Sequence, residues 1–210
     1  MLEKLQDDAL VIIKRIEKLR SEDEVLTFKV ARLLKELVAL LEQQKEDNQE
    51  IIKFLYQTYN YVGDMFANIG RFALSAKYHQ EALELARRLE NTPENIVSVF
   101  SKLLRDRNYY VDDDCEDVKE LVKGMISEQV IEKELTERKN HRRSLKHDPV
   151  EMSKEYLDVI DEVEEKISKN RTIFGMGACH EIWHLKYVYL AERGIQWRSP
   201  AVLNPRVMFD

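Results

Sequence analysis

Apolar side chains recur at steps of three and four residues along most of this chain, and that spacing constrains its fold more than any other feature. The first stripe consists of Leu2, Leu5, Ala9, Ile12, Ile16 and Leu19. Such spacing places apolar side chains on one face of an α-helix, which must then pack against another element. The 210 residues include only four prolines and six glycines, too few for the many turns of an all-β fold. We therefore predict an all-α protein of about seven to nine helices, stacked as antiparallel hairpins in a superhelix or irregular bundle.

The composition narrows the class of protein further. Hydrophobic residues make up 44% of the chain and charged residues 34%, and the formal net charge of −6 disfavours broad nucleic-acid binding. Cys115 and Cys179 are the only cysteines, too few for a disulfide framework. The N-terminus lacks the basic start and apolar run of a signal peptide, and no apolar stretch approaches the ~18 residues of a membrane span. We expect a protein of a bacterial-type cytoplasm with no membrane association.

Four segments have the composition of a helix start. Residues 21–24 and 47–50 combine a capping side chain with a glutamate, which together can satisfy the free amides of a first turn. Residues 92–94 and 148–151 place proline at the first helical position, where its missing N–H costs little. Apolar spacing over residues 118–135 predicts one further helix and then stops. We predict a single all-α domain over residues 1–210, with a candidate boundary near 136–148 between a repeat-like N-terminal part and a C-terminal helical part.

Residues 56–89 carry a more specific pattern of small and bulky side chains. Its members are Tyr59, Val62, Gly63, Phe66, Gly70, Phe72, Ser75, His79, Ala82 and Leu83. The spacing resembles one degenerate tetratricopeptide repeat, a pair of antiparallel helices of the kind that stacks into peptide-binding solenoids. The resemblance implies that small residues let the two helices approach closely and that Gly70 takes positive φ at the turn. Ser75 and His79 depart from the family pattern, which prefers alanine and an aromatic residue at those positions.

The resemblance also implies a binding face on the first helix of the pair. Counted by family position, Gln57, Asn60, Asp64 and Asn68 would line a concave groove, where amide and carboxylate groups can bond the backbone of an extended peptide. The alternative is that these side chains are only the solvated face of an amphipathic helix. One repeat cannot bury its own faces, so neighbouring helix pairs, or a second copy of the chain, must cover them.

One segment near the C-terminus matches the zinc-hydrolase pattern H-E-x-x-H on an expected helix. His180 and His184 would share a helical face and hold zinc, while Glu181 would be the base that activates a water molecule. The further histidine of that pattern is absent, and only Glu192 and Asp210 are placed to serve as a third ligand. The alternative is that the apolar residues of this helix face the core and the histidines are merely polar neighbours.

The segment over residues 138–147 has a basic excess. Its cationic side chains are those of Arg138, Lys139, Arg142, Arg143 and Lys146. They could neutralise the phosphates of a nucleic acid, and binding would then weaken steeply with salt. No aromatic side chain interleaves with them to stack on bases, and the alternative is a solvated helix face.

These patterns together predict a non-enzymatic scaffold that binds a protein or peptide partner, needs no cofactor and can self-associate. A zinc-dependent hydrolase and a nucleic-acid-associated protein are the alternatives. After Gly194 the chain is too rich in proline for long elements, and its apolar residues should pack back onto the body. Those residues are Trp197, Leu203, Val207, Met208 and Phe209.

Overall fold

The computed structural model describes residues 2–22, 26–44, 48–90, 94–110, 115–140 and 145–209. Over these ranges the protein is all-α, as predicted, and has no β-strand. Its elements are α1 (Leu2–Arg20), α2 (Thr27–Glu42), α3 (Gln49–Asn68), α4 (Phe72–Ala86), α5 (Ile96–Arg107), α6 (Glu116–Val122), α7 (Glu128–Asn140), the 3₁₀-helix η1 (Pro149–Met152), α8 (Lys154–Asn170), α9 (Ala178–Ala191) and α10 (Pro200–Leu203).

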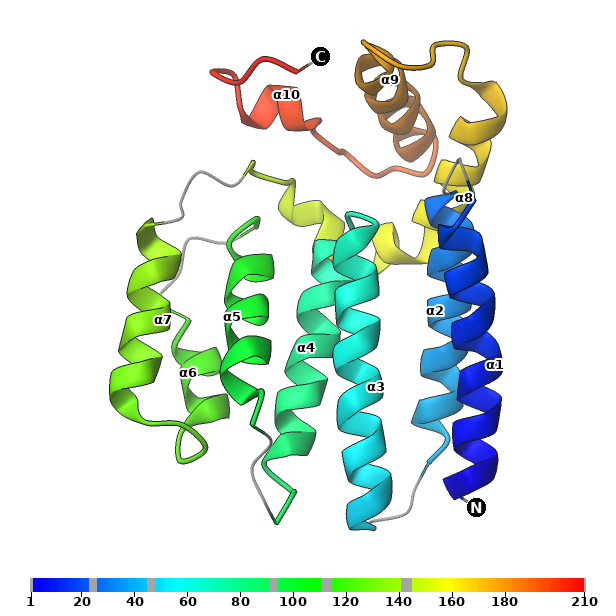
Figure 1. The fold of residues 1–210 in the computed structure, drawn as a ribbon. Helices are drawn as coiled ribbons and strands as arrows, with labels where there is room; N and C mark the ends of the chain where they lie inside the picture. Colours follow the sequence, from blue (N-terminus) through cyan, green and yellow to red (C-terminus); the bar gives the residue numbers. More distant parts are fainter. Residues whose placement is uncertain are drawn as a thin grey trace.

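Helices α1 to α7 lie side by side in one array, and α9 and α10 lie beyond one end of it (Figure 1). Helix α8 leads from the array to this C-terminal part and packs beside α2. Arg32 of α2 contacts Glu165 of α8 at 2.6 Å, which ties the two helices together at the surface. No described helix has both the length and the apolar character that a membrane crossing requires.

The buried apolar residues form two clusters, which draw on different stretches of the chain. The larger cluster draws on α1 to α7, from Leu5 to Leu135. The smaller one draws on α8, α9 and the segment after them, from Tyr156 to Trp197. Leu157 packs against both clusters. The boundary near residues 136–148 stays a prediction, since Leu157 makes the two cores contiguous.

Two of the four expected helix starts, at residues 47–50 and 148–151, have a capping side chain among the described residues, and residue 47 lies outside them. The Asn48 side chain accepts a hydrogen bond from the Glu50 amide and begins α3. Asp148 accepts from the Val150 amide and begins η1, and Ser153 then caps α8. Residues 92 and 93 lie outside the described ranges.

At the helix start expected over residues 21–24, Ser21 bonds the end of α1 instead of capping α2. The Ser21 hydroxyl donates to the Lys18 carbonyl at the end of α1, and α2 begins at Thr27 after Leu26, which has no side-chain cap. Residues 23 and 24 lie outside the described ranges. A serine after the last turn of a helix can bond the free carbonyls of that turn, so it need not cap the helix that follows.

The single helix expected over residues 118–135 is wrong, because the structure has α6 and α7 in its place. Gly124 takes a φ of +82° between them, in the left-handed region that favours glycine. The apolar spacing continues across this break because both short helices pack on the same core. This division and the four-residue α10 account for the larger number of helices than expected.

The α3–α4 hairpin has the tight turn that its sequence predicts. Gly70 has a φ of +74° and donates to the Ala67 carbonyl, while the Arg71 amide donates to the Phe66 carbonyl. These two hydrogen bonds satisfy the free carbonyls at the end of α3 in the manner of a Schellman motif. The turn reverses the chain and places Arg71 directly before α4.

The two helices of this hairpin approach closely at Gly63. A Cβ atom built on Gly63 would lie 2.6 Å from the ring of His79 on α4, closer than two non-bonded carbon atoms can come. His79 is fully buried. The imidazole therefore fills the space that the missing side chain of Gly63 leaves open, and this contact sets the distance between α3 and α4.

The C-terminal tail packs onto the body only in part. Trp197 is buried, and the Phe209 ring stacks edge-on against Trp183. Met208, by contrast, is 94% exposed and Val207 is 44% exposed, so the expectation that these two would pack is wrong. Phe209 contacts Trp183 of α9, whereas the side chains of Val207 and Met208 lie largely in solvent.

We expect Gly63→Ala to lower the free energy of unfolding by about 1–3 kcal/mol, because the added methyl group overpacks the His79 contact. Helix propensity alone would give the opposite sign, a gain of about 1 kcal/mol. Chemical denaturation measures the difference. In a His79→Ala background the same substitution should be neutral or stabilising, and an equal loss in both backgrounds would show that the contact is not the cause.

Candidate functional site

The four expected groove residues lie on one face of α3, and they divide into two pairs. Gln57 and Asn68 are exposed, whereas Asn60 and Asp64 are half-buried. Lys102 of α5 donates to Asn60 Oδ1 at 3.2 Å and to Asp64 Oδ2 at 2.8 Å. The half-buried pair therefore joins α3 to α5, and the exposed pair lies on either side of it along the helix.

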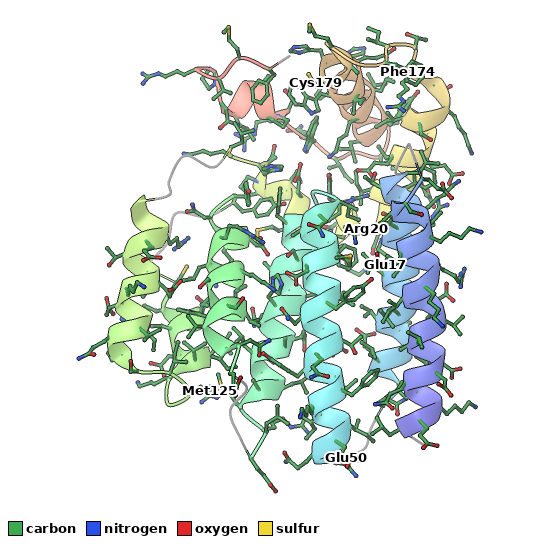
Figure 2. The ribbon with its side chains drawn as sticks, in the orientation of Figure 1. Glu17, Arg20, Glu50, Met125, Phe174 and Cys179 are labelled. Atoms are coloured by element: carbon green, nitrogen blue, oxygen red, sulfur yellow. The ribbon has the colours of Figure 1, made fainter. Side chains whose placement is uncertain are left out.

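A second polar contact links the same helix to α1. The Tyr61 hydroxyl donates to Glu17 at 2.9 Å, and Figure 2 shows Glu17 on the side of α1 that is turned toward α3. Together with the Lys102 contacts, this hydrogen bond makes a row of polar side chains across α1, α3 and α5. We call this row, with Gln57 and Asn68, the α1–α3–α5 face.

A buried polar cluster lies behind this face, where α3, α4 and α5 meet. Ser75 Oγ donates to Asp106 Oδ2 at 2.5 Å, and His79 Nδ1 lies 3.1 Å from the same oxygen. On its other side, His79 Nε2 lies 3.4 Å from Asp64 Oδ1. Ser75 and His79 are the two departures from the tetratricopeptide pattern, and here both serve to bind Asp106.

These residue types occur together in hydrolases, but their arrangement here is structural. In a catalytic triad the serine hydroxyl donates to histidine and is open to substrate. Here Ser75 donates to the carboxylate, and Ser75, His79 and Asp106 are all fully buried. Burial alone would lower the pKa of His79, but the hydrogen bonds and charges of Asp106 and Asp64 outweigh it and raise that pKa.

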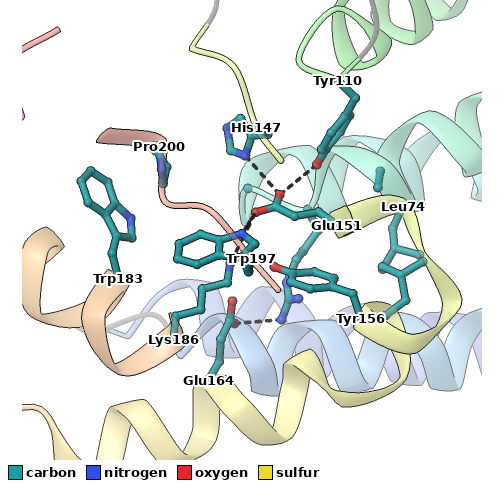
Figure 3. Close-up of a pocket in the computed structure, with 14 residues that line it drawn as sticks. Leu74, Tyr110, His147, Glu151, Tyr156, Glu164, Trp183, Lys186, Trp197 and Pro200 are labelled. Carbon is teal, nitrogen blue, oxygen red and sulfur yellow. Dashed lines mark hydrogen bonds and ion pairs between the residues drawn. The ribbon is translucent and has the colours of Figure 1, made fainter. Parts of the chain in front are cut away.

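A pocket of about 100 Å³ lies at the junction of the two parts of the chain. Its lining residues come from the α3–α4 turn and the start of α4, the segment after α5, η1 and the residues just before it, α8, α9, and the segment from the end of α9 to the start of α10. Its lining includes Arg71, Tyr110, His147, Glu151, Tyr156, Glu164, Trp183, Lys186 and Trp197. Most of these side chains converge on one small space (Figure 3). We call it the junction pocket.

Glu151 is the best-coordinated side chain of the junction pocket. The Trp197 indole donates to its Oε1 at 2.7 Å, while the Tyr110 hydroxyl donates to Oε2 at 3.3 Å and His147 Nδ1 lies 3.2 Å from that oxygen (Figure 3). Burial alone would raise the pKa of Glu151, but the hydrogen bonds and the positive charge of Lys186 outweigh it and lower the pKa to about 2. The carboxylate is therefore charged, and its partners occupy both of its oxygens.

Lys186 is held differently from Glu151. Its ammonium lies 3.7 Å from Glu151 Oε1, an ion-pair distance that is too long for a hydrogen bond. The Tyr156 and Trp197 rings lie 5.2 and 4.7 Å from it. Burial lowers the pKa of Lys186, and the negative charges of Glu151 and Glu164 only partly oppose that effect.

Arg71 forms the floor of the junction pocket and is only 6% exposed. Its Nη2 contacts Asp161 at 3.0 Å and Glu164 at 2.9 Å. Its Nε and Nη1 are buried and have no hydrogen-bond acceptor among the described residues. The guanidinium is thus paired on one side only.

The expected zinc motif lies on α9, and its glutamate has another partner. Glu181 accepts hydrogen bonds from the Thr172 and Ile173 amides and from the Thr172 hydroxyl, at 2.7 to 3.0 Å. It therefore fixes the loop that precedes α9. His180 and His184 are exposed, and His180 Nε2 lies 3.2 Å from the Phe209 carbonyl.

Among the described residues, no three or more His, Cys, Asp or Glu side chains are grouped so that they could hold a metal ion. Asp210, one of the two third ligands considered, lies outside the described residues, and Glu192 pairs with Lys166 at 2.9 Å. The hydrolase hypothesis stays a prediction.

The basic segment is only partly described. Arg138 is buried, which differs from the solvated helix face that was the alternative interpretation. Lys146 is exposed, and its backbone exchanges two hydrogen bonds of 2.9 Å with the Asn204 side chain. Residues 141–144 and the side chain of Lys139 lie outside the described part of the chain. Nucleic-acid binding through this segment stays a prediction.

Sequence reasoning missed the junction pocket. Glu151 reads as a helix-start residue, Trp197 as tail packing and Arg71 as the residue after a turn. One signal was available, since Trp183 and Lys186 lie three residues apart and share a face of α9. Periodicity cannot show which distant residues complete a pocket on that face.

No protein-family model matches the chain, and comparisons with curated proteins and with solved structures also found no match. The α1–α3–α5 face and the junction pocket are therefore the features of this chain that bear on its function.

We expect the buried histidine to make the stability of the protein depend on pH. The pKa of His79 is raised above its unfolded value of 6.5, so its protonation favours the folded state. That contribution is complete below pH ~6.5 and is lost as the pH rises through the folded pKa, with a limiting slope of about 1.4 kcal/mol for each pH unit. Chemical denaturation between about pH 6 and 9 should therefore show a steeper loss of stability for the wild type than for His79→Gln.

The exposed His180 supplies the matched control for this experiment. The variant His180→Gln should keep the slope of the wild type, because that imidazole gains no buried carboxylate on folding. If the wild type and His79→Gln show the same slope, the imidazole is neutral in the folded protein and our assignment of its charge is wrong.

Proposed function

We propose that this chain is a non-enzymatic helical scaffold that binds an extended segment of a partner protein along the α1–α3–α5 face. The observation that carries the proposal is the row of polar side chains across α1, α3 and α5. In this proposal α3 and α4 form a tetratricopeptide-like pair. The helices on either side, α1 with α2 and α5 with α6 and α7, complete the stack.

The chemistry of this face suits an extended peptide. Amide groups at Gln57 and Asn68 are exposed and carry both donors and acceptors, which is what the backbone of an extended ligand needs. Asp64 and Lys102 add one charge of each sign and keep side-chain exposures of 35% and 24%. Because Lys102 holds Asn60 and Asp64 in place, a ligand would meet side chains that are already ordered, which lowers the entropic cost of binding.

We further propose that the scaffold works in a bacterial-type cytoplasm. Its two cysteines give no disulfide framework, and its charge balance disfavours nucleic acid as the main partner. A second copy of the chain is the alternative occupant of the face, since an incomplete stack of hairpins leaves apolar ends open.

Site-specific photo-crosslinking in the native host tests the proposal. A photoreactive residue at Gln57 or Asn68 should cross-link to one defined partner protein, while the same residue at Lys77 or Glu84 should not. These control positions are also exposed but lie on α4, the second helix of the hairpin. Identification of the adduct by mass spectrometry names the partner.

Substitution of the two exposed residues of this face, Gln57 and Asn68, tests whether their side chains are needed for binding. Gln57→Ala with Asn68→Ala should reduce the yield of the adduct formed from a photoreactive residue at Lys53, which is exposed one turn before Gln57. The exposed pair is preferable to Asn60 and Asp64, because these two also hold Lys102. Equal cross-linking from positions on α3 and on α4 would contradict the assignment of the binding face to α3. If the only adduct is with a second copy of the chain, the face serves self-association and not a partner protein.

A further inference from the structure

The junction pocket presents more hydrogen-bond donors than acceptors to its interior. Both Glu151 oxygens have partners, and Glu164 Oε2 accepts from Thr27 and from Arg71, while Glu164 Oε1 has no donor among the described residues. The Lys186 ammonium is within 3.7 Å of a carboxylate but within hydrogen-bond distance of none, and Arg71 keeps Nε and Nη1 without acceptors among the described residues. Buried donors without acceptors are costly, so this arrangement favours a ligand that brings acceptor atoms.

From this excess of donors we infer that the junction pocket binds a carboxylate group that has a short apolar stem. A carboxylate is an acceptor-only group with a single negative charge, and it matches an ammonium and a guanidinium that both have unused N–H groups. The group can come from a small organic acid or from the C-terminus of a peptide, and the chemistry of recognition is the same for both.

The volume and the lining of the pocket limit the size and the polarity of the part of the ligand that carries the carboxylate. A cavity of about 150 Å³ holds benzene, so the 100 Å³ here accommodates about four or five non-hydrogen atoms. The Tyr156, Trp183 and Trp197 rings form part of the wall, and Leu74 and Pro200 add aliphatic surface. These walls favour an apolar stem over a polar one.

The negative charges in the wall select against larger anions. Glu151 is ionised at neutral pH, and Glu164 pairs with Arg71 as a carboxylate. A phosphate dianion would bring a second negative charge next to both groups, and like charges at such distances repel strongly in a partly buried site. A monoanion meets the same two carboxylates with half the charge of a dianion, so it is repelled less while it is still attracted by Lys186.

This inference is independent of the proposed function. The junction pocket lies beyond the α3–α4 turn and shares no residue with the α1–α3–α5 face. A scaffold that binds no peptide on α3 could still bind a carboxylate here, and the converse also holds.

Intrinsic fluorescence gives a direct readout, because Trp183 and Trp197 are the only two tryptophans and both line the pocket. Titration of the full chain with sodium propionate at constant ionic strength should give a saturable change in tryptophan emission. Propionamide has the same shape without the charge and should give none. Inorganic phosphate should bind at least ~10-fold more weakly than propionate, because of the like charges in the wall.

The variant Lys186→Met removes the ammonium and keeps the length of the side chain. It should weaken propionate binding about ten- to hundredfold, the usual range for loss of a charge-assisted hydrogen bond. The control Lys154→Met makes the same change of charge on α8, where the side chain is 83% exposed, and should stay within about twofold of the wild type. Circular dichroism checks that both variants fold.

Titration with a peptide distinguishes the two possible sources of the carboxylate, a small organic acid and the C-terminus of a peptide. Acetyl-Ala-Ala with a free C-terminus should bind as well as propionate if the pocket takes chain ends, and its amidated form should then fail. Binding of propionate alone assigns the pocket to a free organic acid.

The inference is overturned if propionate gives no saturable change, in which case the pocket holds water only. It is also overturned if propionamide or phosphate binds as well as propionate, or if a folded Lys186→Met binds propionate normally. Should Lys186→Met fail to fold, the comparison of propionate, propionamide and phosphate on the wild-type chain decides the matter alone.

Discussion

The contact between Arg71 and two carboxylates of α8 fixes how the two parts of this protein sit together. Arg71 lies at the end of the α3–α4 turn, and Asp161 and Glu164 lie one turn apart on α8. Lys35 of α2 also contacts Asp161, at 2.5 Å. Because the guanidinium is almost fully buried, loss of both carboxylates would leave an uncompensated charge, at a cost of about 3–5 kcal/mol. Such a contact tolerates only one orientation of α8 relative to the hairpin, and the junction pocket exists because of that orientation.

A second buried polar contact, the cluster of Ser75, His79 and Asp106, lies in the interior of the N-terminal part. Burial of Ser75, His79 and Asp106 costs more than burial of apolar residues of the same size. In return, each of these groups has a specific partner, whereas an apolar residue at position 79 could slide along α3. The bulk of the imidazole also fits the gap at Gly63, so one side chain fixes both the distance and the register between α3 and α4. Ser75 and His79, which differ from the repeat pattern that the sequence resembles, therefore both have partners within the chain.

The sequence was informative about local structure and silent about distant pairing. The all-α class, the Asn48 cap and the turn at Gly70 follow from spacing and from the preferences of single residues, and the structure has all three. The break at Gly124 was missed because the apolar rhythm runs through it unchanged. Arg71 and Asp161 are 90 residues apart, and no periodic pattern encodes their contact.

The H-E-x-x-H segment shows the same limit, because its glutamate lies near the start of α9 and accepts from free amides of the preceding loop. Glu181 would serve catalysis only if that loop found its hydrogen bonds elsewhere.

The two candidate sites share one structural element, the α3–α4 hairpin. Asp64 stands on the α1–α3–α5 face and also contacts His79, so the polar face is joined to the buried cluster. At the other end of the hairpin, the turn positions Arg71 beneath the junction pocket. A movement of α4 against α3 would displace both sites at once, and the Gly63–His79 contact leaves no room for the two helices to come closer together. Each site is therefore preorganised by the same tight packing, although their ligands would be recognised by different chemistry.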